Sequence, residues 1–131
     1  MPNVFISYAH ADRDHVEHLV RALRATNIAG WLDATDIAAG ASVPSAVREA
    51  LQRSSAVIVF LSNSALHNQW VQFEIGAAEA LGKMIIPVIV SGNQLAEQLP
   101  EILKDRTVID ARNQPYAAVV NEISRELERV K

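Results

Sequence analysis

Two short apolar runs constrain the fold of this chain more than any other feature. Residues 56–61 read AVIVFL and residues 84–90 read MIIPVIV, and neither run alternates between polar and apolar side chains. Continuous β-branched runs of this length are typical of strands that are buried on both faces, and such strands occur mostly in parallel sheets covered by helices. The sequence therefore predicts an α/β fold with helices on both faces of the sheet.

Three further strands and the helices between them complete the prediction. The expected strands are 4–7, 30–33, 56–61, 84–90 and 107–110; the expected helices follow Asp12 and Ser42, span 70–81 and span 116–130, with a weak helical turn at 94–99. Residues 62–68 read as a polar turn, and Pro87 predicts a bulge or an edge in the fourth strand. Strands that alternate with helices predict a flavodoxin-like three-layer sandwich, with a five-stranded parallel sheet of order 2-1-3-4-5. Its ligand crevice would lie beyond the ends of strands one and three, at residues 7–9 and 62–63.

The composition narrows the range of functions. The chain has 131 residues, of which 50% are hydrophobic and 21% charged, and this suits a single soluble domain over residues 1–131. It has no cysteine, which excludes disulfides and thiolate metal sites, and no apolar run long enough to cross a bilayer. The net charge of −3 without a basic run gives no reason to expect a nucleic-acid partner. We therefore expect a cytoplasmic protein with no membrane or nucleic-acid partner. The uncapped helix end at Lys131 suggests the N-terminal part of a longer protein.

The predicted helix 70–81, WVQFEIGAAEAL, carries one acidic residue in an unusual place. At helical spacing, Trp70, Phe73, Ala77 and Leu81 form an apolar stripe that should face the core, and Glu74 falls inside this stripe. A carboxylate in such a position must be paired, shifted toward its neutral form or open to a cleft. Because the helix follows the third strand directly, one part of the chain supplies both Glu74 and the predicted crevice.

Several functions that this fold can host lack their residues here. A phosphoacceptor receiver needs an aspartate after strand three and a lysine after strand five, where this chain has Ser62 and Arg112. Neither a Thr/Gly-rich loop after strand one nor a GxGxxG or GxxxxGK[ST] motif occurs. His15 and His18 share a helix face without a third ligand at metal-site spacing, and a lone His67 at a helix start is typical of a surface residue. We therefore expect no metal.

Three stretches in this order, VFISYAHAD, GWLDATDIAAG and WVQFEIGAAEALGK, resemble the Toll/interleukin-1 receptor (TIR) domain, and most closely its bacterial branch. The resemblance covers nearly the whole chain. Many animal members of this family are adaptors, whereas bacterial, plant and some animal members cleave NAD at the nicotinamide–ribose bond. The enzymatic members resemble one another in a glutamate four residues after a tryptophan, and Trp70 and Glu74 match this pattern. The resemblance thus implies that Glu74 is catalytic. The loop 34–43 keeps Gly40 but lacks the Arg-Asp and Pro-Gly signature of the adaptors.

A single carboxylate suits this chemistry. As nicotinamide leaves, positive charge builds on the ribose, and a carboxylate aimed at the ribose stabilises it. The leaving group is already cationic and departs neutral, so it needs no general acid. Burial of Glu74 is expected to raise its pKa unless ribose hydroxyls or backbone donors compensate. Trp70, one turn earlier, would provide a flat wall.

The other site residues are expected around the crevice. Substrate-binding residues are expected at the end of strand one, in the flanking loop, at the end of strand three and before the catalytic residue: Phe5, Ser7, Tyr8, Asp33, Asp36, Gly40, Ser62, Asn63 and Trp70. Ala9 and His10 stand where several NAD-cleaving relatives carry a basic residue, so no phosphate clamp is expected there. Structural alternatives remain open: Glu74 could pair with Arg48 or Arg53, Trp70 could be core, Asp33 and Asp36 could be turn residues, and Gly76 could pack closely on the sheet.

Three functions remain open at this point. The first is an NAD⁺ glycohydrolase-type TIR domain that takes NAD⁺ as substrate, needs no cofactor, gives nicotinamide and ADP-ribose or a cyclic isomer, and acts in prokaryotic defence signalling or NAD depletion. The second is a non-catalytic TIR–TIR interaction module. The third is a nucleoside deoxyribosyltransferase-like enzyme. Members of the family commonly self-associate, which implies TIR–TIR contacts through loop 34–43, a fused sensor or oligomerisation domain, and weak activity of the isolated chain in dilute solution.

Overall fold

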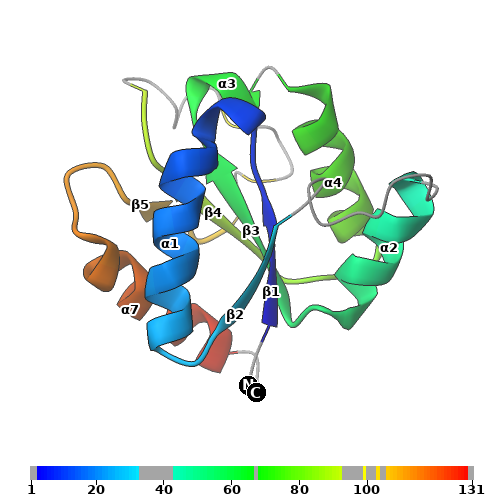
Figure 1. The fold of residues 1–131 in the computed structure, drawn as a ribbon. Helices are drawn as coiled ribbons and strands as arrows, with labels where there is room; N and C mark the ends of the chain where they lie inside the picture. The colour runs from blue at the N-terminus through cyan, green and yellow to red at the C-terminus, as the bar shows by residue number, and fades with distance from the viewer. Residues whose placement is uncertain are drawn as a thin grey trace.

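The computed structural model has the predicted α/β architecture (Figure 1). It describes residues 3–32, 43–66, 68–92, 99, 103 and 106–129, without the side chains of 31, 32, 43–47 and 70. Five parallel strands form one sheet in the order β2-β1-β3-β4-β5, which confirms the predicted order 2-1-3-4-5. The strands are β1 (Asn3–Ser7), β2 (Ala29–Leu32), β3 (Ala56–Leu61), β4 (Ile85–Ile89) and β5 (Ile109–Asp110).

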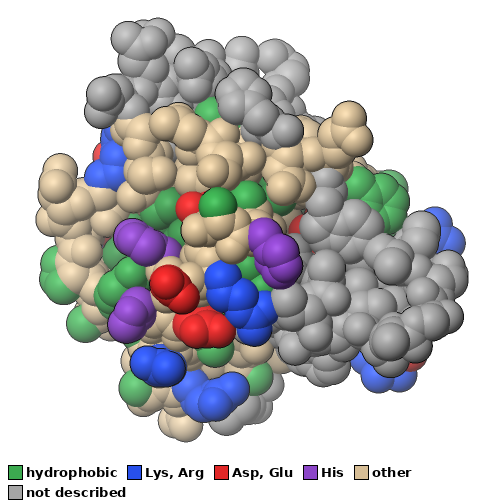
Figure 2. Space-filling view, turned by 45° about the horizontal axis from the view of Figure 1, so that its top comes forward, with side chains coloured by type: hydrophobic (Ala, Val, Ile, Leu, Met, Phe, Trp, Pro, Cys, Tyr) green, Lys and Arg blue, Asp and Glu red, His purple; other side chains and the backbone are tan. Residues whose placement is uncertain are grey.

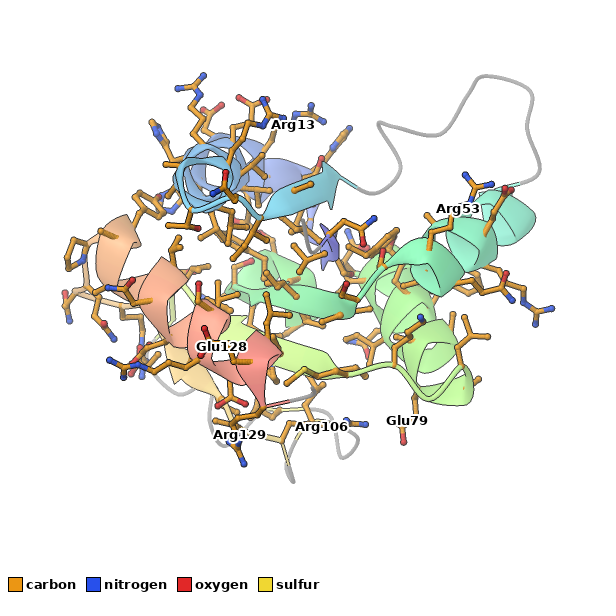
Figure 3. All side chains as sticks on the ribbon, turned by 90° about the horizontal axis from the view of Figure 1, so that it is seen from below. Arg13, Arg53, Glu79, Arg106, Glu128 and Arg129 are labelled. Atoms are coloured by element: carbon orange, nitrogen blue, oxygen red, sulfur yellow. The ribbon has the colours of Figure 1, made fainter. Side chains whose placement is uncertain are left out.

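Helices cover both faces of this sheet. α1 (Arg13–Ala25) and α7 (Tyr116–Glu128) lie on one face, and α2 (Val43–Arg53) and α4 (Gln69–Ala80) lie on the other (Figures 1 and 3). Two short elements follow strand ends, namely η1 (His10–Asp12) after β1 and α3 (Asn63–Leu66) after β3. Within the described part of the chain, no helix is long and apolar enough to cross a membrane.

Alternate residues along a strand pack into two separate hydrophobic cores, one on each face of the sheet. Val4 and Ile6 of β1 pack in the core under α1 and α7, while Phe5 packs in the core under α2 and α4. Every residue of β3 is buried, as its continuous β-branched run predicts. On α1, the predicted inward residues Val16, Leu19, Val20 and Leu23 are all buried. The hydrophobic pattern therefore determines which side of each element faces the sheet.

Local signals explain where the helices end. The side chain of Asn68 accepts a hydrogen bond from the Val71 N–H (3.0 Å) and so caps the start of α4. At its other end Gly82 has φ +66°, and the N–H of Lys83 donates to the carbonyl of Ala78 (3.0 Å) in the arrangement that ends many helices. Asn27 (φ +64°) ends α1 in the same way.

Three predicted details differ in the structure. The expected turn at 62–68 contains the short helix α3, because the Ser62 hydroxyl accepts from the Ala65 N–H (3.1 Å) and caps it. The expected strand 107–110 pairs only at Ile109 and Asp110, and the expected strand 30–33 spans Ala29–Leu32. The expected helical turn at 94–99 lies almost wholly outside the described residues.

Pro87 lies inside β4 without costing a hydrogen bond of the sheet. The register of β4 with β3 is continuous from Ile85 to Ile89, so the strand has no bulge there. The N–H of Val90 donates toward β3, whereas the carbonyl of Ile89 accepts on the β5 side. Successive residues of a strand direct their backbone groups to opposite neighbouring strands, so the nitrogen of Pro87 faces the β5 side. On that side β5 pairs with β4 only from Val88 onward. The sheet therefore has a local edge at Pro87, as predicted.

Candidate active site

The helix α4 turns a different face to the core from the one predicted. The buried residues are Val71, Glu74, Ile75 and Ala78, at the i, i+3, i+4 and i+7 spacing of a core-facing side. The predicted stripe is wrong at Phe73, whose side chain is 39% exposed. The sequence of α4 has apolar residues around most of its circumference, so its periodicity alone does not select a face. The prediction that Glu74 is buried is nevertheless confirmed.

Glu74 is a buried carboxylate that accepts a hydrogen bond from a buried hydroxyl. The Oγ of Ser7, at the end of β1, donates to Glu74 Oε1 at 2.6 Å, and both residues are 0% exposed. Ser7 follows Phe5 on the side of β1 that faces α4, so the alternation of the strand aims its hydroxyl at the helix. A short hydrogen bond to a carboxylate is stronger than one between neutral groups, and it fixes the orientation of the acceptor.

Of the two arginines expected as structural partners of Glu74, Arg48 and Arg53, the second has another partner. Arg53 pairs with Glu49 (2.7 Å) one turn away on the exposed side of α2. Gly76 also departs from expectation, because it is exposed and a Cβ built there would have no atom within 4 Å. Close packing therefore does not explain this glycine.

At the carboxyl edge, Ser62 connects the ends of β1 and β3. Its hydroxyl donates to the carboxylate of Asp12 in η1 and accepts from the N–H of Ala65. Asp12 holds the predicted N-cap position of α1, but its side chain binds Ser62 rather than capping that helix. Ser62 is thus committed to two protein partners, while Asn63 beside it is exposed. Sequence reasoning missed the role of Asp12 because the contact joins residues 50 positions apart.

Tyr8 lies on the opposite face of the sheet from Ser7. Its ring is buried in the core under α1 and α7, and its hydroxyl accepts a hydrogen bond from Arg13 Nη1 (2.9 Å). Arg13 also donates to Glu17 (3.0 Å), and this hydrogen bond is the main cause that raises the pKa of Arg13. The structure therefore brings Phe5 and Ser7 to the α4 side and separates the Tyr8 side chain from them.

The remaining predicted site residues cannot be placed. Asp33, Asp36 and Gly40 lie outside the described residues, as does His67, and the side chain of Trp70 is not described. Histidines and charged side chains of both signs gather on one face in the view that brings the carboxyl edge forward (Figure 2). Among the described residues, no group of three acidic or histidine side chains could hold a metal ion.

This arrangement can stabilise a cation. One carboxylate, held by a hydroxyl and surrounded by the apolar side chains of the α2/α4 core, acts in surroundings that screen its charge weakly. It lies on the helix that begins soon after β3, next to the end of β1, where the strand order reverses. Ligands of open parallel sheets bind at such reversal points.

The chain is 29% identical to the NAD(+) hydrolase TcpC of Escherichia coli O6:H1 over 133 residues, which cover 96% of this chain and 42% of TcpC. The chain thus spans about two-fifths of the length of this curated relative.

Two solved structures share the fold. The TIR domain of the Toll-related receptor TRR-2 from Hydra magnipapillata matches with a TM-score of 0.80 at 23% identity, over 95% of this chain and 97% of that one. The TIR domains of the activated Roq1 resistosome, which recognises the effector XopQ, match with a TM-score of 0.73 at 19% identity, over 97% and 99% of the two chains. A family model described as TIR domain matches residues 4–127, so this chain belongs to the TIR domain family.

Proposed function

We propose that this chain cleaves NAD⁺ at the nicotinamide–ribose bond, with Glu74 as the catalytic carboxylate. The observation that carries the proposal is the Ser7–Glu74 hydrogen bond, because it orients a fully buried carboxylate at the reversal point of the sheet. Burying a charged group costs free energy, and a domain that only binds partners gains nothing from it. Family membership and the identity to an NAD(+) hydrolase support the same activity.

The chemistry follows from the position of the charge. The bond between the ribose C1′ and the pyridinium nitrogen breaks, and its electron pair goes to nicotinamide, which leaves neutral. The cation left on the ribose is stabilised by the carboxylate of Glu74, which Ser7 holds in one orientation. Water then attacks C1′ and loses a proton, which gives ADP-ribose. If a group of the substrate itself attacks instead of water, a cyclic isomer forms and the proton comes from that group.

The burial of Glu74 supports a resting state that needs activation. At 0% exposure, its carboxylate cannot touch a substrate until the packing around it rearranges. We propose that self-association of the domain drives this rearrangement, with loop 34–43 and a fused sensor or oligomerisation domain as the means of assembly. NAD depletion or defence signalling would then follow assembly. Activity per mole of chain is therefore expected to rise with protein concentration.

The deciding experiment measures nicotinamide release from NAD⁺ by the chain and three variants over a range of protein concentrations. Glu74→Gln and Glu74→Ala should lower the rate by at least about 100-fold, as the loss of a main electrostatic stabiliser does. Glu79→Gln is the matched control, because it removes a carboxylate from the exposed side of the same helix. Circular dichroism checks that each variant folds. Equal rates for the parent and folded Glu74→Gln would refute the proposal.

A non-catalytic interaction module is the second candidate. Such a module would use the outer side of α4, where Phe73 is 39% exposed. The same experiment separates the two functions. If the parent is inert even at high concentration, and Glu74→Ala is at least as stable as the parent, the interaction module is the better description. Membership of the TIR domain family argues against the third candidate, a deoxyribosyltransferase-like enzyme.

A further inference from the structure

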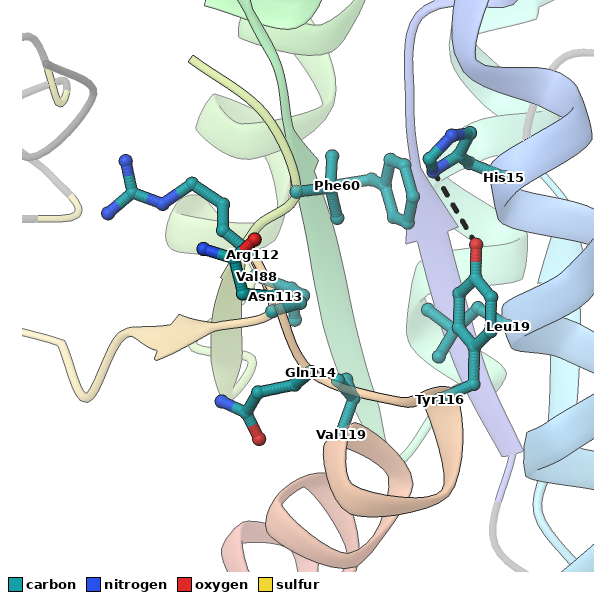
Figure 4. A pocket seen from close by; sticks show the side chains of 11 residues that line it. His15, Leu19, Phe60, Val88, Arg112, Asn113, Gln114, Tyr116 and Val119 are labelled. Carbon is teal, nitrogen blue, oxygen red and sulfur yellow. Dashed lines mark hydrogen bonds between the residues drawn. The ribbon is translucent and has the colours of Figure 1, made fainter. Parts of the chain in front are cut away.

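A cavity opens at the carboxyl edge of the sheet, on the face that α1 and α7 cover (Figure 4). It has a volume of about 220 Å³ and lies between the ends of β3, β4 and β5 and the helices α1 and α7. Phe60 and Val88 on its floor belong to the α1/α7 core, whereas α4 packs on the other core. The cavity is therefore separate from the candidate active site, although both lie at the edge where parallel α/β sheets bind ligands.

The wall of the cavity is largely apolar. Beneath it, Leu19, Phe60, Val88 and Val119 are each at most 2% exposed and belong to the packed core, so the apolar surface that a ligand can reach comes from the half-buried Val90, Ala111 and Tyr116. The ring of Phe60 lies edge to face with His15, with 6.4 Å between the ring centroids. An accessible apolar wall that includes the aromatic ring of Tyr116 favours a flat, unsaturated ligand.

Among the described residues that line the cavity, hydrogen-bonding side chains stand at the rim. The hydroxyl of Tyr116 and the Nδ1 of His15 are 3.5 Å apart, which is longer than an ordinary hydrogen bond of these groups. Both groups can therefore bind a ligand without breaking a strong contact. Asn113, with φ +65°, presents its amide from the loop between β5 and α7.

Arg112, the one arginine among the described residues that line the cavity, already binds two protein partners. Nε and Nη2 of Arg112 donate to the two carboxylate oxygens of Asp110, each at 2.9 Å, and Nη1 donates to the carbonyl of Gly92 at 2.7 Å. This pairing lowers the pKa of Asp110 and raises that of Arg112. Binding a phosphate or carboxylate would require the guanidinium to leave these partners.

We propose that this cavity binds a neutral heteroaromatic ring with one hydrogen-bonding substituent, such as a pyridine carboxamide or a purine base. The ring would pack against Val90, Ala111 and the ring of Tyr116, and the substituent would meet the Tyr116 hydroxyl and His15 at the rim. The volume is below the roughly 300–1,000 Å³ of sites for drug-sized ligands, so it suits one or two rings. The proposal does not depend on NAD⁺ cleavage, because the cavity and Glu74 face opposite sides of the sheet.

The test is a proton–nitrogen correlation NMR titration of the chain with nicotinamide, adenine and nicotinate at one fixed pH. Nicotinate has the size of nicotinamide but carries a charge. We expect saturable shifts at His15 and at residues 111–116, and binding of nicotinate weaker by at least about tenfold, because Arg112, the one arginine among the described lining residues, is already paired.

Two variants locate the binding. Tyr116→Phe removes only the hydroxyl, and we expect about fivefold weaker binding from the loss of one hydrogen bond. Ala111→Leu fills the half-buried lining and should abolish binding, whereas Ala117→Leu adds the same side chain at an exposed position of α7 and should not. Tyr116→Phe keeps the test valid if Ala111→Leu fails to fold.

Three outcomes would overturn the proposal. The first is the absence of saturable shifts with either neutral probe. The second is binding of nicotinate as tight as that of nicotinamide. The third is a set of shifts confined to Ser7 and α4, since the probe would then occupy the candidate active site instead.

Discussion

Replacing Ser7 by alanine removes one hydroxyl from the interior and leaves the shape of the side chain almost unchanged. The hydroxyl donates to Glu74 Oε1 at 2.6 Å, and both residues are fully buried, so water does not replace the lost donor. Hydrogen bonds to charged groups contribute about 1.5–3 kcal/mol, and Ser7→Ala should therefore lower the free energy of unfolding by about 2 kcal/mol. No cavity cost adds to this, because only one oxygen atom is lost.

Urea unfolding followed by circular dichroism measures this change. With a slope of about 2 kcal/mol per molar urea, the midpoint should fall by about 1 M. Ser54→Ala is the matched control, because its hydroxyl is also buried but donates to the neutral carbonyl of Ala50 (2.7 Å). The control should cost about 1 kcal/mol or less.

A double-mutant cycle assigns the loss to the pair. Glu74→Gln keeps an acceptor oxygen but removes the charge, so Ser7→Ala should cost about 1–2 kcal/mol less in the Glu74→Gln background than in the parent. The reasoning would be refuted if Ser7→Ala cost no more than Ser54→Ala, or if it cost the same in both backgrounds.

Three further predictions concern α4 and β5. Gly76→Ala should raise the free energy of unfolding by about 1 kcal/mol, because the added methyl meets no atom and alanine favours a helix; an unchanged urea midpoint would contradict this. Asn68→Ala should lower the free energy of unfolding by about 1 kcal/mol, because the hydrogen bond that caps α4 at Val71 is lost, whereas Asn68→Asp keeps an acceptor oxygen and should retain most of the stability. Equal losses in both variants would show that the cap is unimportant. Arg112 lowers the pKa of Asp110 from 3.8, so the pair stabilises the fold above that pH and loses its effect as the pH falls through the lowered pKa. Asp110→Asn should therefore reduce the dependence of the urea midpoint on pH below about 4, and an unaltered dependence would count against the pairing.

The sequence predicts the sheet well because its strands carry their own signals. The β-branched runs at 56–61 and 84–90 mark strands that stay buried in any parallel α/β arrangement, and alternation with helices limits the strand order. Helix ends are similarly local, since Gly82 and Asn27 adopt the left-handed conformation that ends a helix. The burial of Glu74 follows from the apolar residues on either side of it.

The partners within the site were beyond sequence reasoning. The bond between Ser7 and Glu74 joins residues 67 positions apart, and it depends on how far α4 is rotated about its axis. The predicted rotation is wrong at Phe73, because apolar residues surround much of the helix. Packing of α4 on β1 and β3 determines which of these residues are buried. The link from Ser62 to Asp12 was missed for the same reason, since each residue alone reads as a helix cap or a turn residue.

The end of β1 has a consequence for how this domain tolerates change. Ser7 and Tyr8 are neighbours in sequence, yet one serves the α4 side of the sheet and the other is held by Arg13 on the α1 side. A shift of the strand by one residue in one direction would present the phenol of Tyr8 to Glu74 and the methyl group of Ala9 to Arg13. A shift in the other direction would present Ile6 to Glu74 and the hydroxymethyl group of Ser7 to Arg13. Inserting or deleting one residue between Asn3 and Ser7 would thus disturb both faces of the sheet at once, whereas a substitution disturbs only one.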